Sequence, residues 1–517
     1  MKFLRHHTQH SAKYLHVIIF LTVLLNSQSS LAIESRKIEK LIEDTQPPDK
    51  KAVLLQESQK TLKEGRKYYF KFCVHCHGNK GAGDGTASYH LFPQPRELSQ
   101  GIYKFHTTRT NTLPLNKDLI HTIKKGIPGT AMPAWEKVLS EETIQSIVEF
   151  IKTFSSRFSM EVPGREIVVS LEPPMDELSI ANGKQLYKEL RCDKCHGEDG
   201  GKEGKLSETI KNFLGTPTFV YDLRQQNLYK SGSTGADIYQ TLVTGLDGSP
   251  MNAYDYLSNV ERWNLVHFLQ SRYIRQKTKP SAITAKIISK KINFPITLQM
   301  QESVWAETLK TVIKLTPIRA RKNPINNVVI QSMYNGKKIA IRMRWRDSTP
   351  DSILKNKYVD QSAIQFSIGG EDITDSPFYG MGEKNKPVNI WHWKADIKQK
   401  IIQNNESVSK AYEKLSSSMS KMFLNPFSES SVEEINSKGI GTLTLQSLED
   451  QQVEGRGYWE NEHWSVIFIR DLETLSKWDV SFTRKKNILL AFALWDGDKK
   501  DMNANKVVSF WQTLSLQ

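Results

Sequence analysis

The sequence predicts a multidomain chain, with two small all-α domains followed by a mostly antiparallel β-sandwich domain. A cysteine–histidine motif and a later methionine loop recur with an offset of 119 residues, which indicates two domains of one design in tandem. Beyond residue 282 the apolar pattern changes from helical spacing to alternation, which is typical of strands. The length of 517 residues also exceeds that of one ordinary domain.

The N-terminus has the features of a secretory signal peptide. A basic start and an apolar run of about 12 residues (14–25) precede Ala32, which closes a small-x-small pattern. Such a run is short for a bilayer span, so an uncleaved anchor is the weaker alternative. The pattern predicts a signal peptide over 1–32, an N-terminal segment over 33–56, and a periplasmic protein without a transmembrane anchor after cleavage.

The charge balance narrows the class of partner. The formal net charge is +15, and it falls to +12 without residues 1–32, which carry three positive charges and no negative ones. For an exported protein this charge favours acidic proteins or anionic surfaces as partners, and nucleic acid is not expected. A charged surface that serves only solubility is the equal alternative.

The cysteines define two possible cofactor sites. Their C-x-x-C-H spacing is a signature of covalent c-type haem, in which the thiols bind the vinyl groups and the histidine binds iron. A zinc site would need both cysteine pairs, which lie 119 residues apart, and a thioredoxin-like pair would need a different βαβ context. The two motifs consist of Cys73, Cys76 and His77, and of Cys192, Cys195 and His196.

A methionine follows each motif at the same distance. Met132, in GIPGTAMPAW, lies 55 residues after His77, and Met251, in GLDGSPMNAY, lies 55 residues after His196. A distal methionine is a common second iron ligand in electron carriers. The alternative is that each methionine fills the apolar core. We therefore predict two histidine–methionine iron sites.

Helix signals surround both motifs. Ser140 is an N-cap candidate before an i, i+3, i+4, i+7 apolar pattern over 144–151, and Ser258-x-x-Glu261 forms a capping box. Each copy is predicted as helix, C-x-x-C-H, Gly-rich loop, helix, Met loop, helix. The Gly-rich loops lack a preceding strand and a following Gly-Lys-Ser/Thr, so they are not predicted to bind phosphate.

On these motifs both copies resemble class I, mono-haem cytochrome c domains. The resemblance implies a small helical fold around each haem, with His77/Met132 and His196/Met251 as axial pairs. In the second copy Asn252 and a tyrosine stand where the first has proline and tryptophan after the methionine. The predicted domains cover 57–158 and 181–273, with linkers over 159–180 and 274–299.

The C-terminal half reads as a β-sandwich with an insertion. Two alternating runs flank Asn335-Gly336 within 326–345, which is a strong hairpin signal. Further strands are expected at SAIQFSI, HWSVIFIRDL and NILLAFALWDG. The Ser-rich stretch 404–423 is expected to be helical or loose.

Residues 300–517 resemble the ethylbenzene dehydrogenase-related haem-binding domain. The resemblance rests on WRDSTPD, the MG…VNIWHWKA run, FIRDL, and WDG…KVVSFW. It implies a non-covalent b haem held by a methionine and a lysine. Met381 matches the methionine and Lys506 best matches the lysine, with Lys499 and Lys500 as competitors.

Together the resemblances imply an electron-transfer protein with two covalent c haems and one b haem. The expected role is a γ-type subunit of a periplasmic molybdenum oxidoreductase, similar in architecture to nitrite oxidoreductase systems. Its expected partners are iron–sulfur and molybdopterin subunits and a soluble cytochrome or terminal oxidase. The alternatives are a dihaem peroxidase-like enzyme and a dihaem c cytochrome whose β-sandwich binds a ligand or partner but no haem.

Overall fold

The computed structural model describes residues 50–517 except 214, 275–283, 353–357 and 396–430. The predicted signal peptide and the Ser-rich stretch 404–423 lie outside the described residues. Residues Glu64–Gln517 form one compact unit. Over the described ranges, no helix is both long enough and apolar enough to cross a membrane.

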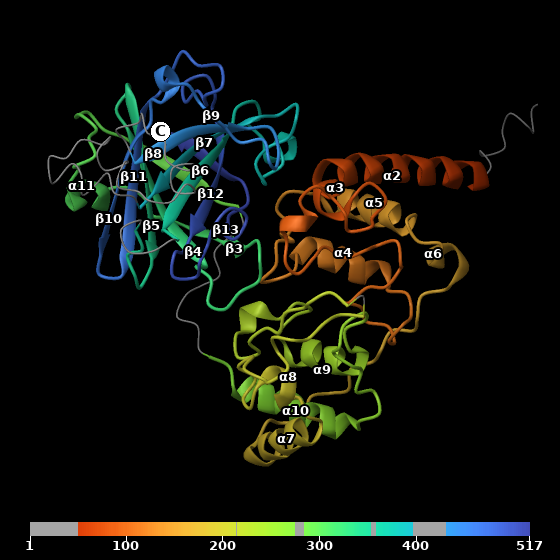
Figure 1. Ribbon diagram of the computed structural model, residues 1–517. Helices are drawn as coiled ribbons and strands as arrows, with labels where there is room; N and C mark the ends of the chain where they lie inside the picture. Colours follow the sequence, from red (N-terminus) through yellow and green to blue (C-terminus); the bar gives the residue numbers. More distant parts are fainter. Residues whose placement is uncertain (1–49, 214, 275–283, 353–357, 396–430) are drawn as a thin grey trace, which may run out of the picture. The chain divides into compact units, whose positions relative to one another are not determined.

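The N-terminal half is helical, as predicted, and its elements repeat (Figure 1). The short α3 and α8 carry the two cysteine–histidine motifs, and the pairs α4/α9 and α5/α10 follow in the same order. The helices are α2 (Lys50–Phe72), α3 (Val74–His77), α4 (Asn116–Lys125), α5 (Glu141–Lys152), α6 (Arg157–Met160), α7 (Glu177–Glu189), α8 (Asp193–His196), α9 (Gly235–Thr244) and α10 (Asn259–Ser271), with 3-10 turns η1 (Ser88–His90) and η2 (Gln226–Leu228).

The predicted caps are confirmed. Ser140 Oγ accepts a hydrogen bond from Thr143 N at 3.2 Å, and Ser258 forms a reciprocal capping box with Glu261. Such caps satisfy backbone N–H groups that have no partner within the helix. The apolar stripe of α5 is buried, as its spacing predicted.

A glycine allows the first and last helices of each repeat to cross closely. A Cβ atom added at Gly65 would lie 1.9 Å from Ser146 O, and one added at Gly183 would lie 1.9 Å from Asn264 O. Gly65 and Gly183 are 118 residues apart, and the two residues whose carbonyls they approach, Ser146 and Asn264, are separated by the same number. Contact between the helices therefore depends on the absence of a side chain at these two positions.

The predicted linker 159–180 is attached to both helical repeats. Ile167 N donates to Thr107 O at 2.8 Å in the first repeat, and Ser170 Oγ accepts from Trp263 Nε1 at 2.9 Å in the second. Helix α7 begins at Glu177, inside the range predicted as linker. The segment therefore makes hydrogen bonds with both helical repeats.

The C-terminal half is a single large sheet with short helical turns. Hydrogen bonding follows the order β10-β11-β5-β4-β1-β14-β12-β6-β7-β8-β9. The strands are β1 (Lys286–Lys291), β2 (Thr311–Lys314), β3 (Thr316–Pro317), β4 (Asn327–Tyr334), β5 (Lys338–Arg346), β6 (Gln361–Ser367), β7 (Val388–Lys394), β8 (Val432–Ser437), β9 (Thr444–Leu445), β10 (Glu454–Glu460), β11 (His463–Asp471), β12 (Ile488–Trp495), β13 (Val507–Val508) and β14 (Gln512–Leu516), with α11 (Glu302–Ala306), η3 (Ile373–Asp375) and η4 (Leu448–Asp450).

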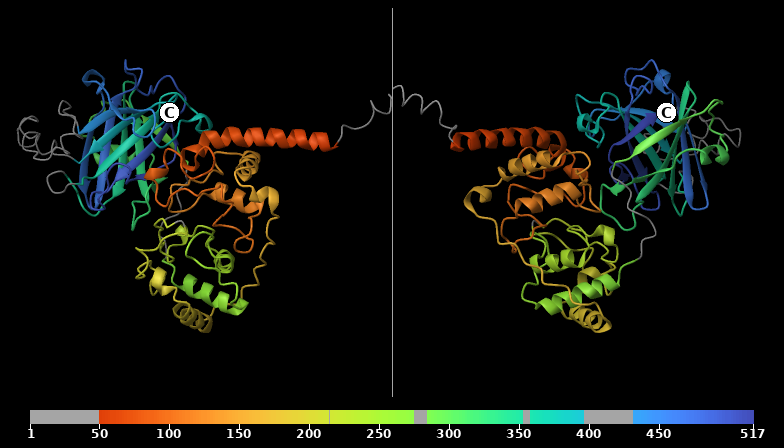
Figure 2. Two further views of the ribbon diagram at one scale, coloured as in Figure 1. Left: turned by 45° about the vertical axis from the view of Figure 1, so that its right-hand side comes forward. Right: turned by 180° about the vertical axis from the view of Figure 1, so that it is seen from behind.

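The sheet curls so that its two halves face each other across one core (Figure 2). A Cβ at Gly457 in β10 would lie 2.2 Å from the ring of Trp393 in β7, although these strands are far apart in the strand order. The Trp393 and Trp464 rings lie 5.0 Å apart in this core. The sandwich is therefore made of one continuous, mostly antiparallel sheet.

Two sequence predictions differ in outcome here. The hairpin at Asn335-Gly336 is confirmed, since β4 and β5 flank it and Gly336 has a φ of 83°. The linker prediction over 274–299 is wrong for part of its length, because β1 pairs in parallel with β14 and β4. The run KIISKK contains three lysines, but Ile287, its second residue, is fully buried.

Asp347 of the WRDSTPD motif, Asp496 of the WDG motif and Asp360, which directly precedes β6, form a buried acidic cluster. Carboxylate oxygens of Asp347, Asp360 and Asp496 lie within 4.8 Å of one another. Asp360 accepts hydrogen bonds from Gly497 N at 2.8 Å and from Trp464 Nε1 at 2.9 Å. Burial, and then the charge of the neighbouring carboxylates, raises the pKa values of Asp347 and Asp360.

This cluster predicts the pH dependence of the sheet domain. A carboxyl with a raised pKa keeps its proton in the folded state while the unfolded chain releases it, so stability falls as pH rises above the usual aspartate range of about 4. Asp347→Asn should flatten this fall, and Glu460→Gln, at an exposed position, should not. Urea unfolding followed by tryptophan fluorescence at several pH values, with EDTA present, measures it; stability rising over this range would contradict it.

The helix crossing gives a second prediction. Gly183→Ala should lower the free energy of unfolding by about 1–3 kcal/mol, because its methyl group forces α7 away from α10. Thermal unfolding followed by circular dichroism measures the loss. Asn182→Ala, at the exposed neighbouring position of α7, is the matched control and should not destabilise. Equal melting temperatures for the two variants would contradict the packing argument.

Candidate cofactor sites

The first cysteine–histidine motif lies on a single tight turn. Helix α2 ends at Phe72, and His77 N then donates to Cys73 O at 2.9 Å in the short α3. Gly78 follows with a φ of 78°, a conformation that favours glycine, and its carbonyl accepts from Tyr69 Oη at 2.7 Å. This turn presents the two thiols and the imidazole together.

The second motif has the same build. His196 N donates to Cys192 O at 2.8 Å, Gly197 has a φ of 77°, and its carbonyl accepts from Tyr187 Oη at 2.8 Å. Arg191 has a positive φ of 58°, which accommodates one extra residue between the tyrosine and the motif. The bond from the tyrosine to the glycine carbonyl is therefore the same in both motifs, although the tyrosine lies four residues before the first cysteine in one and five in the other.

All eight predicted c-haem residues line one continuous cavity of about 530 Å³. Each repeat contributes its two thiols, its histidine and its methionine to the wall. No disulfide joins the four cysteines, all of which lie among the described residues. The residues are Cys73, Cys76, His77, Met132, Cys192, Cys195, His196 and Met251.

The imidazoles have the state that iron ligation requires. Burial lowers the pKa of His77 and lowers that of His196 to about 4, which favours neutral rings. His77 Nδ1 lies 3.1 Å from Arg96 O, so this bond leaves Nε2 available. Among the described residues His196 Nδ1 has no hydrogen-bond partner. The second imidazole is thus less firmly oriented than the first.

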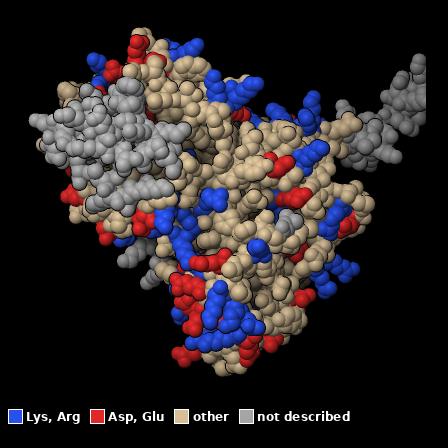
Figure 3. All heavy atoms as spheres, in the orientation of Figure 1, with Lys and Arg blue, Asp and Glu red and all other residues tan. Residues whose placement is uncertain are grey.

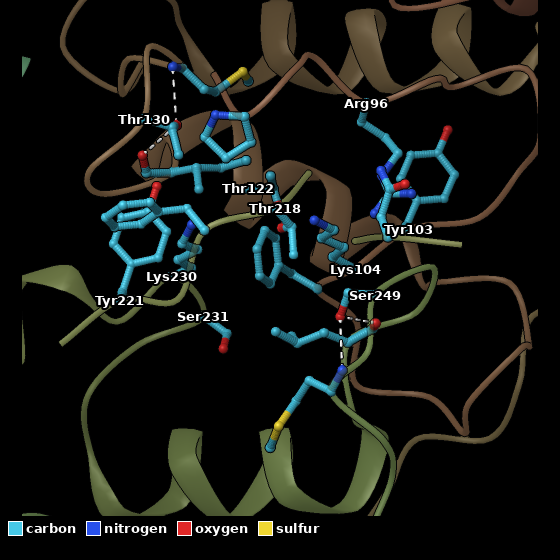
Figure 4. A pocket seen from close by; sticks show the side chains of 18 of the residues that line it. Arg96, Tyr103, Lys104, Thr122, Thr130, Thr218, Tyr221, Lys230, Ser231 and Ser249 are labelled. Carbon is cyan, nitrogen blue, oxygen red and sulfur yellow. Dashed lines mark hydrogen bonds between the residues drawn. The ribbon is translucent and has the colours of Figure 1, made fainter. Parts of the chain in front are cut away.

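Both methionines lie on loops of one design. Gly126 and Gly245 each have a φ of 63° and each approach the loop backbone closely. Thr130 Oγ1 accepts from Met132 N at 3.2 Å, and Ser249 Oγ accepts from Met251 N at 3.3 Å (Figure 4). The replacements at Asn252 and Tyr254 leave this arrangement unchanged, since the backbone after both methionines bonds to its helix in the same way.

Each Met loop also contacts the other repeat. Tyr221 Oη donates to Gly129 O at 3.1 Å, beside the first methionine. Asp247, in the second loop, accepts from Asn111 N at 2.8 Å and lies 3.2 Å from His106 Nε2. His106 thus takes part in the contact between the repeats. The loops of the two predicted c-haem sites are therefore bonded to each other's repeats.

Met381, the predicted methionine of the b-haem site, lies in the loop before β7. Its φ of 80° is unusual for a residue with a side chain, and the loop holds it through a bond from Gly439 N to Met381 O at 3.0 Å. A strained residue that is fixed by its surroundings is a common feature of functional sites. The next residue, Gly382, adjoins Val388 at the start of β7.

Lys506, the predicted lysine, directly precedes β13, and Ile318 N donates to its carbonyl at 3.0 Å. Its Nζ lies 4.5 Å from the centre of the Trp495 ring, and burial lowers its pKa to about 8. A lowered pKa favours the neutral amine, the only form of lysine that can bind iron. The competitors Lys499 and Lys500 are exposed.

Strands β12 and β6, which pair beside β7, place alanines in adjacent rows of the sheet. The strand register aligns Ala493 with Ala363 and Ala363 with His392. In the next row Ala491 aligns with Gln365 and Gln365 with Ile390. Ala363 and Ala491 are buried, and both belong to the apolar cluster that also contains Trp135 of the first cytochrome domain.

The loop that carries Met381 also reaches the first helical repeat. Tyr379 Oη donates to Ala131 O at 3.0 Å, next to Met132, and the same tyrosine lines the large cavity. The ring of Phe378 stacks on His75, inside the first motif, at 4.3 Å. One short segment of the sheet domain thus contacts both the motif and the Met loop of the first repeat.

Sequence reasoning missed Tyr379 and the cavity residues between the repeats. The aromatic-rich run PFYG, directly before Met381, was the available signal, but periodicity could not assign its contacts. Lys104 and Lys230 also line the cavity, and no motif distinguishes them in the sequence.

Family models match three parts of the chain. They are described as cytochrome c oxidase, cbb3-type, subunit III over residues 60–151, cytochrome c over 180–272, and ethylbenzene dehydrogenase over 302–506. These matches agree with the order of domains predicted from the motifs.

Individual relatives are more distant. The chain is 23% identical to the chlorate reductase subunit gamma of Ideonella dechloratans over 186 residues, covering 35% of this chain and 62% of that protein. It is 29% identical to the dimethylsulfide dehydrogenase subunit gamma of Rhodovulum sulfidophilum over 194 residues, covering 36% and 58%. The chain thus spans less than two thirds of the length of these curated relatives.

A solved structure is similar in sequence over part of the chain. It is the reducing HAO-like protein complex of Kuenenia stuttgartiensis, with 36% identity and a TM-score of 0.40 over 41% of this chain and 96% of that chain. Together with the repeated helical design and the curled sheet, the matches to the family models give the assignment. The chain consists of two tandem cytochrome c domains followed by a domain of the ethylbenzene dehydrogenase family.

Proposed function

We propose that the chain is an exported electron-transfer subunit of the γ type in a molybdenum oxidoreductase, with an architecture similar to that of nitrite oxidoreductase systems. In this proposal Cys73, Cys76, Cys192 and Cys195 attach two c haems. The axial pairs are His77 with Met132, and His196 with Met251, while Met381 and Lys506 hold a b haem. The names of the relatives from Ideonella and Rhodovulum support this role.

The observation that carries the proposal is the contact of Tyr379 with the first Met loop. Its hydroxyl donates to the carbonyl of Ala131, the residue before Met132, and its chain position is two residues before Met381. The predicted b-haem ligand and the predicted first c-haem ligand are thus connected through one hydrogen bond and a few covalent bonds. This connection favours a relay over three independent cofactors.

Haem iron, when bound, accepts and releases single electrons, and the surrounding residues control this exchange. Two protein ligands at each proposed iron leave no position for a substrate, which favours electron transfer over peroxidase chemistry. Trp135 packs edge-on against Phe510 at 5.4 Å and helps to seal the contact between the first repeat and the sheet. Exclusion of water from this contact lowers the cost of reorganisation during transfer.

Surface charge bears on the partners. On the face in Figure 3, Lys/Arg and Asp/Glu side chains lie intermixed, so the net positive charge does not form one patch there. We propose iron–sulfur and molybdopterin subunits as the electron donor side, and a soluble cytochrome or terminal oxidase as the other side. Co-purification of a molybdopterin subunit from the native periplasm tests this assignment. Recovery of the chain without one would count against it.

Haem content tests the three-haem proposal. The purified chain should contain three irons, two covalent and one extractable with acid acetone. Met381→Ala and Lys506→Ala should each lose the extractable haem and retain both covalent haems, because only the b site loses a ligand. Haem quantitation before and after extraction gives both numbers.

Matched controls accompany these variants. Met160→Ala and Lys499→Ala change an exposed methionine and an exposed competitor lysine, and both should retain the extractable haem. If the wild-type chain holds two irons, all covalent, the sheet domain is a binding module without haem and the b-haem proposal fails.

The methionine ligands give a second test. Met132→Ala and Met251→Ala should each convert one covalent haem to a high-spin form with an open position, detected by optical and EPR spectra. The wild-type chain should show no high-spin haem and no appreciable peroxide turnover. A high-spin haem in the wild type would instead favour the peroxidase alternative.

A further inference from the structure

The charged side chains that line the large cavity are mostly cationic. They comprise four cations and one carboxylate, which belongs to Glu97. Glu97 accepts hydrogen bonds from Ser99 Oγ at 2.7 Å and Gln100 Nε2 at 2.9 Å, so it is already engaged. The cations are Arg96, Lys104, Arg191 and Lys230.

Three of these cations lie where the two cytochrome domains face each other. Two belong to the first domain and one to the second. Figure 4 shows Lys104 of the first domain and Lys230 of the second in the space between Thr130 and Ser249, and Arg96 of the first domain beside Tyr103. We call Arg96, Lys104 and Lys230 the cation cluster.

Lys230, the member of the cluster from the second domain, packs on a tyrosine that is bonded to the first domain. Lys230 Nζ lies 3.4 Å from the centre of the Tyr221 ring, and the hydroxyl of Tyr221 donates to Gly129 O in the first Met loop. Arg96 Nη2 donates to Asp247 O at 3.2 Å, in the second Met loop. The two domains thus exchange contacts around the cluster.

The two lysines of the cluster lack a compensating negative charge within the described part of the chain, whereas the charges of Asp247 and Glu97 act on Arg96. Burial, followed by the charge of Arg96, lowers the pKa of Lys104 to about 8, and burial, followed by the charge of Lys104, lowers the pKa of Lys230 well below its usual value. Neither lysine has a carboxylate partner among the described residues. Like charges gathered in an apolar cavity cost free energy unless an anion joins them.

We propose that the cation cluster is one shared counter-charge for the carboxylates of both covalent haems. The inference rests on the proposed function, which puts a haem in each cytochrome domain. Each haem carries two carboxylates, and both cysteine–histidine motifs line the cavity that the cluster faces. Lysine and arginine are the side chains that bind carboxylates most strongly.

A shared cluster couples the two haem sites electrostatically. Positive charge near an iron stabilises the reduced form, which carries one positive charge fewer, and the effect falls with distance. Each member of the cluster should therefore raise the midpoint potentials of both c haems. Cations that each served a single haem would act mainly on the potential of their own domain.

Potentials of single-charge variants test the proposal in the full chain. Lys104→Met and Lys230→Met should each lower the midpoint potentials of both c haems, while Lys104→Arg and Lys230→Arg retain the wild-type values. Spectroelectrochemical titration gives the two potentials, and NMR of the haem methyl groups assigns each to its domain. Lys117→Met removes a cation that pairs with Glu166 outside the cavity and should shift neither potential.

The outcomes separate this inference from the proposed function. A downward shift confined to one domain, or absent in both, overturns the shared cluster, whereas fewer than two covalent haems in the wild type overturns the proposed function itself. Where Lys230→Met lowers haem content, Lys230→Gln is measured in its place and the same criterion applies.

Discussion

The proposed relay depends on how one face of the sheet packs against the first cytochrome domain. Aromatic side chains make this contact, with Phe510 against Trp135 and Tyr379 bonded to the loop of Met132. A buried aromatic contact is rigid because it combines a large apolar area with few rotatable bonds. The same segment that makes the contact carries Met381, so any movement at this surface would change the separation of two proposed cofactors.

The second contact, between the two cytochrome domains, is polar and charged. Hydrogen bonds at Asp247 and Tyr221 join each Met loop to the other domain, and the proposed counter-charge lies beside them. Electrostatic interactions of this kind are sensitive to the charge state of their surroundings, whereas apolar contacts are not. The first cytochrome domain therefore has an apolar contact with the sheet domain and a polar, charged contact with the second cytochrome domain.

The local motifs predicted most of the helical half, because attachment of a c-type haem demands fixed residue types at fixed spacing. The caps, the two Met loops and the repeat offset all follow from such short-range rules. Strand β1 was missed because a buried strand of six residues with lysines at both ends has no distinctive pattern. Lys104, Lys230 and Tyr379 were missed because their roles arise from contacts between domains, which no periodicity encodes.

Gly65 and Gly183 bear on how such domains can be found in other sequences. At both positions any side chain would collide with the backbone of the facing helix. The requirement for glycine is therefore independent of which side chains surround it. The offset between them matches the offset between the aromatic residues Phe150 and Phe268 that they face. A glycine before the cysteine motif, paired with an aromatic residue in the last helix, can thus serve as a search signature where overall identity has decayed.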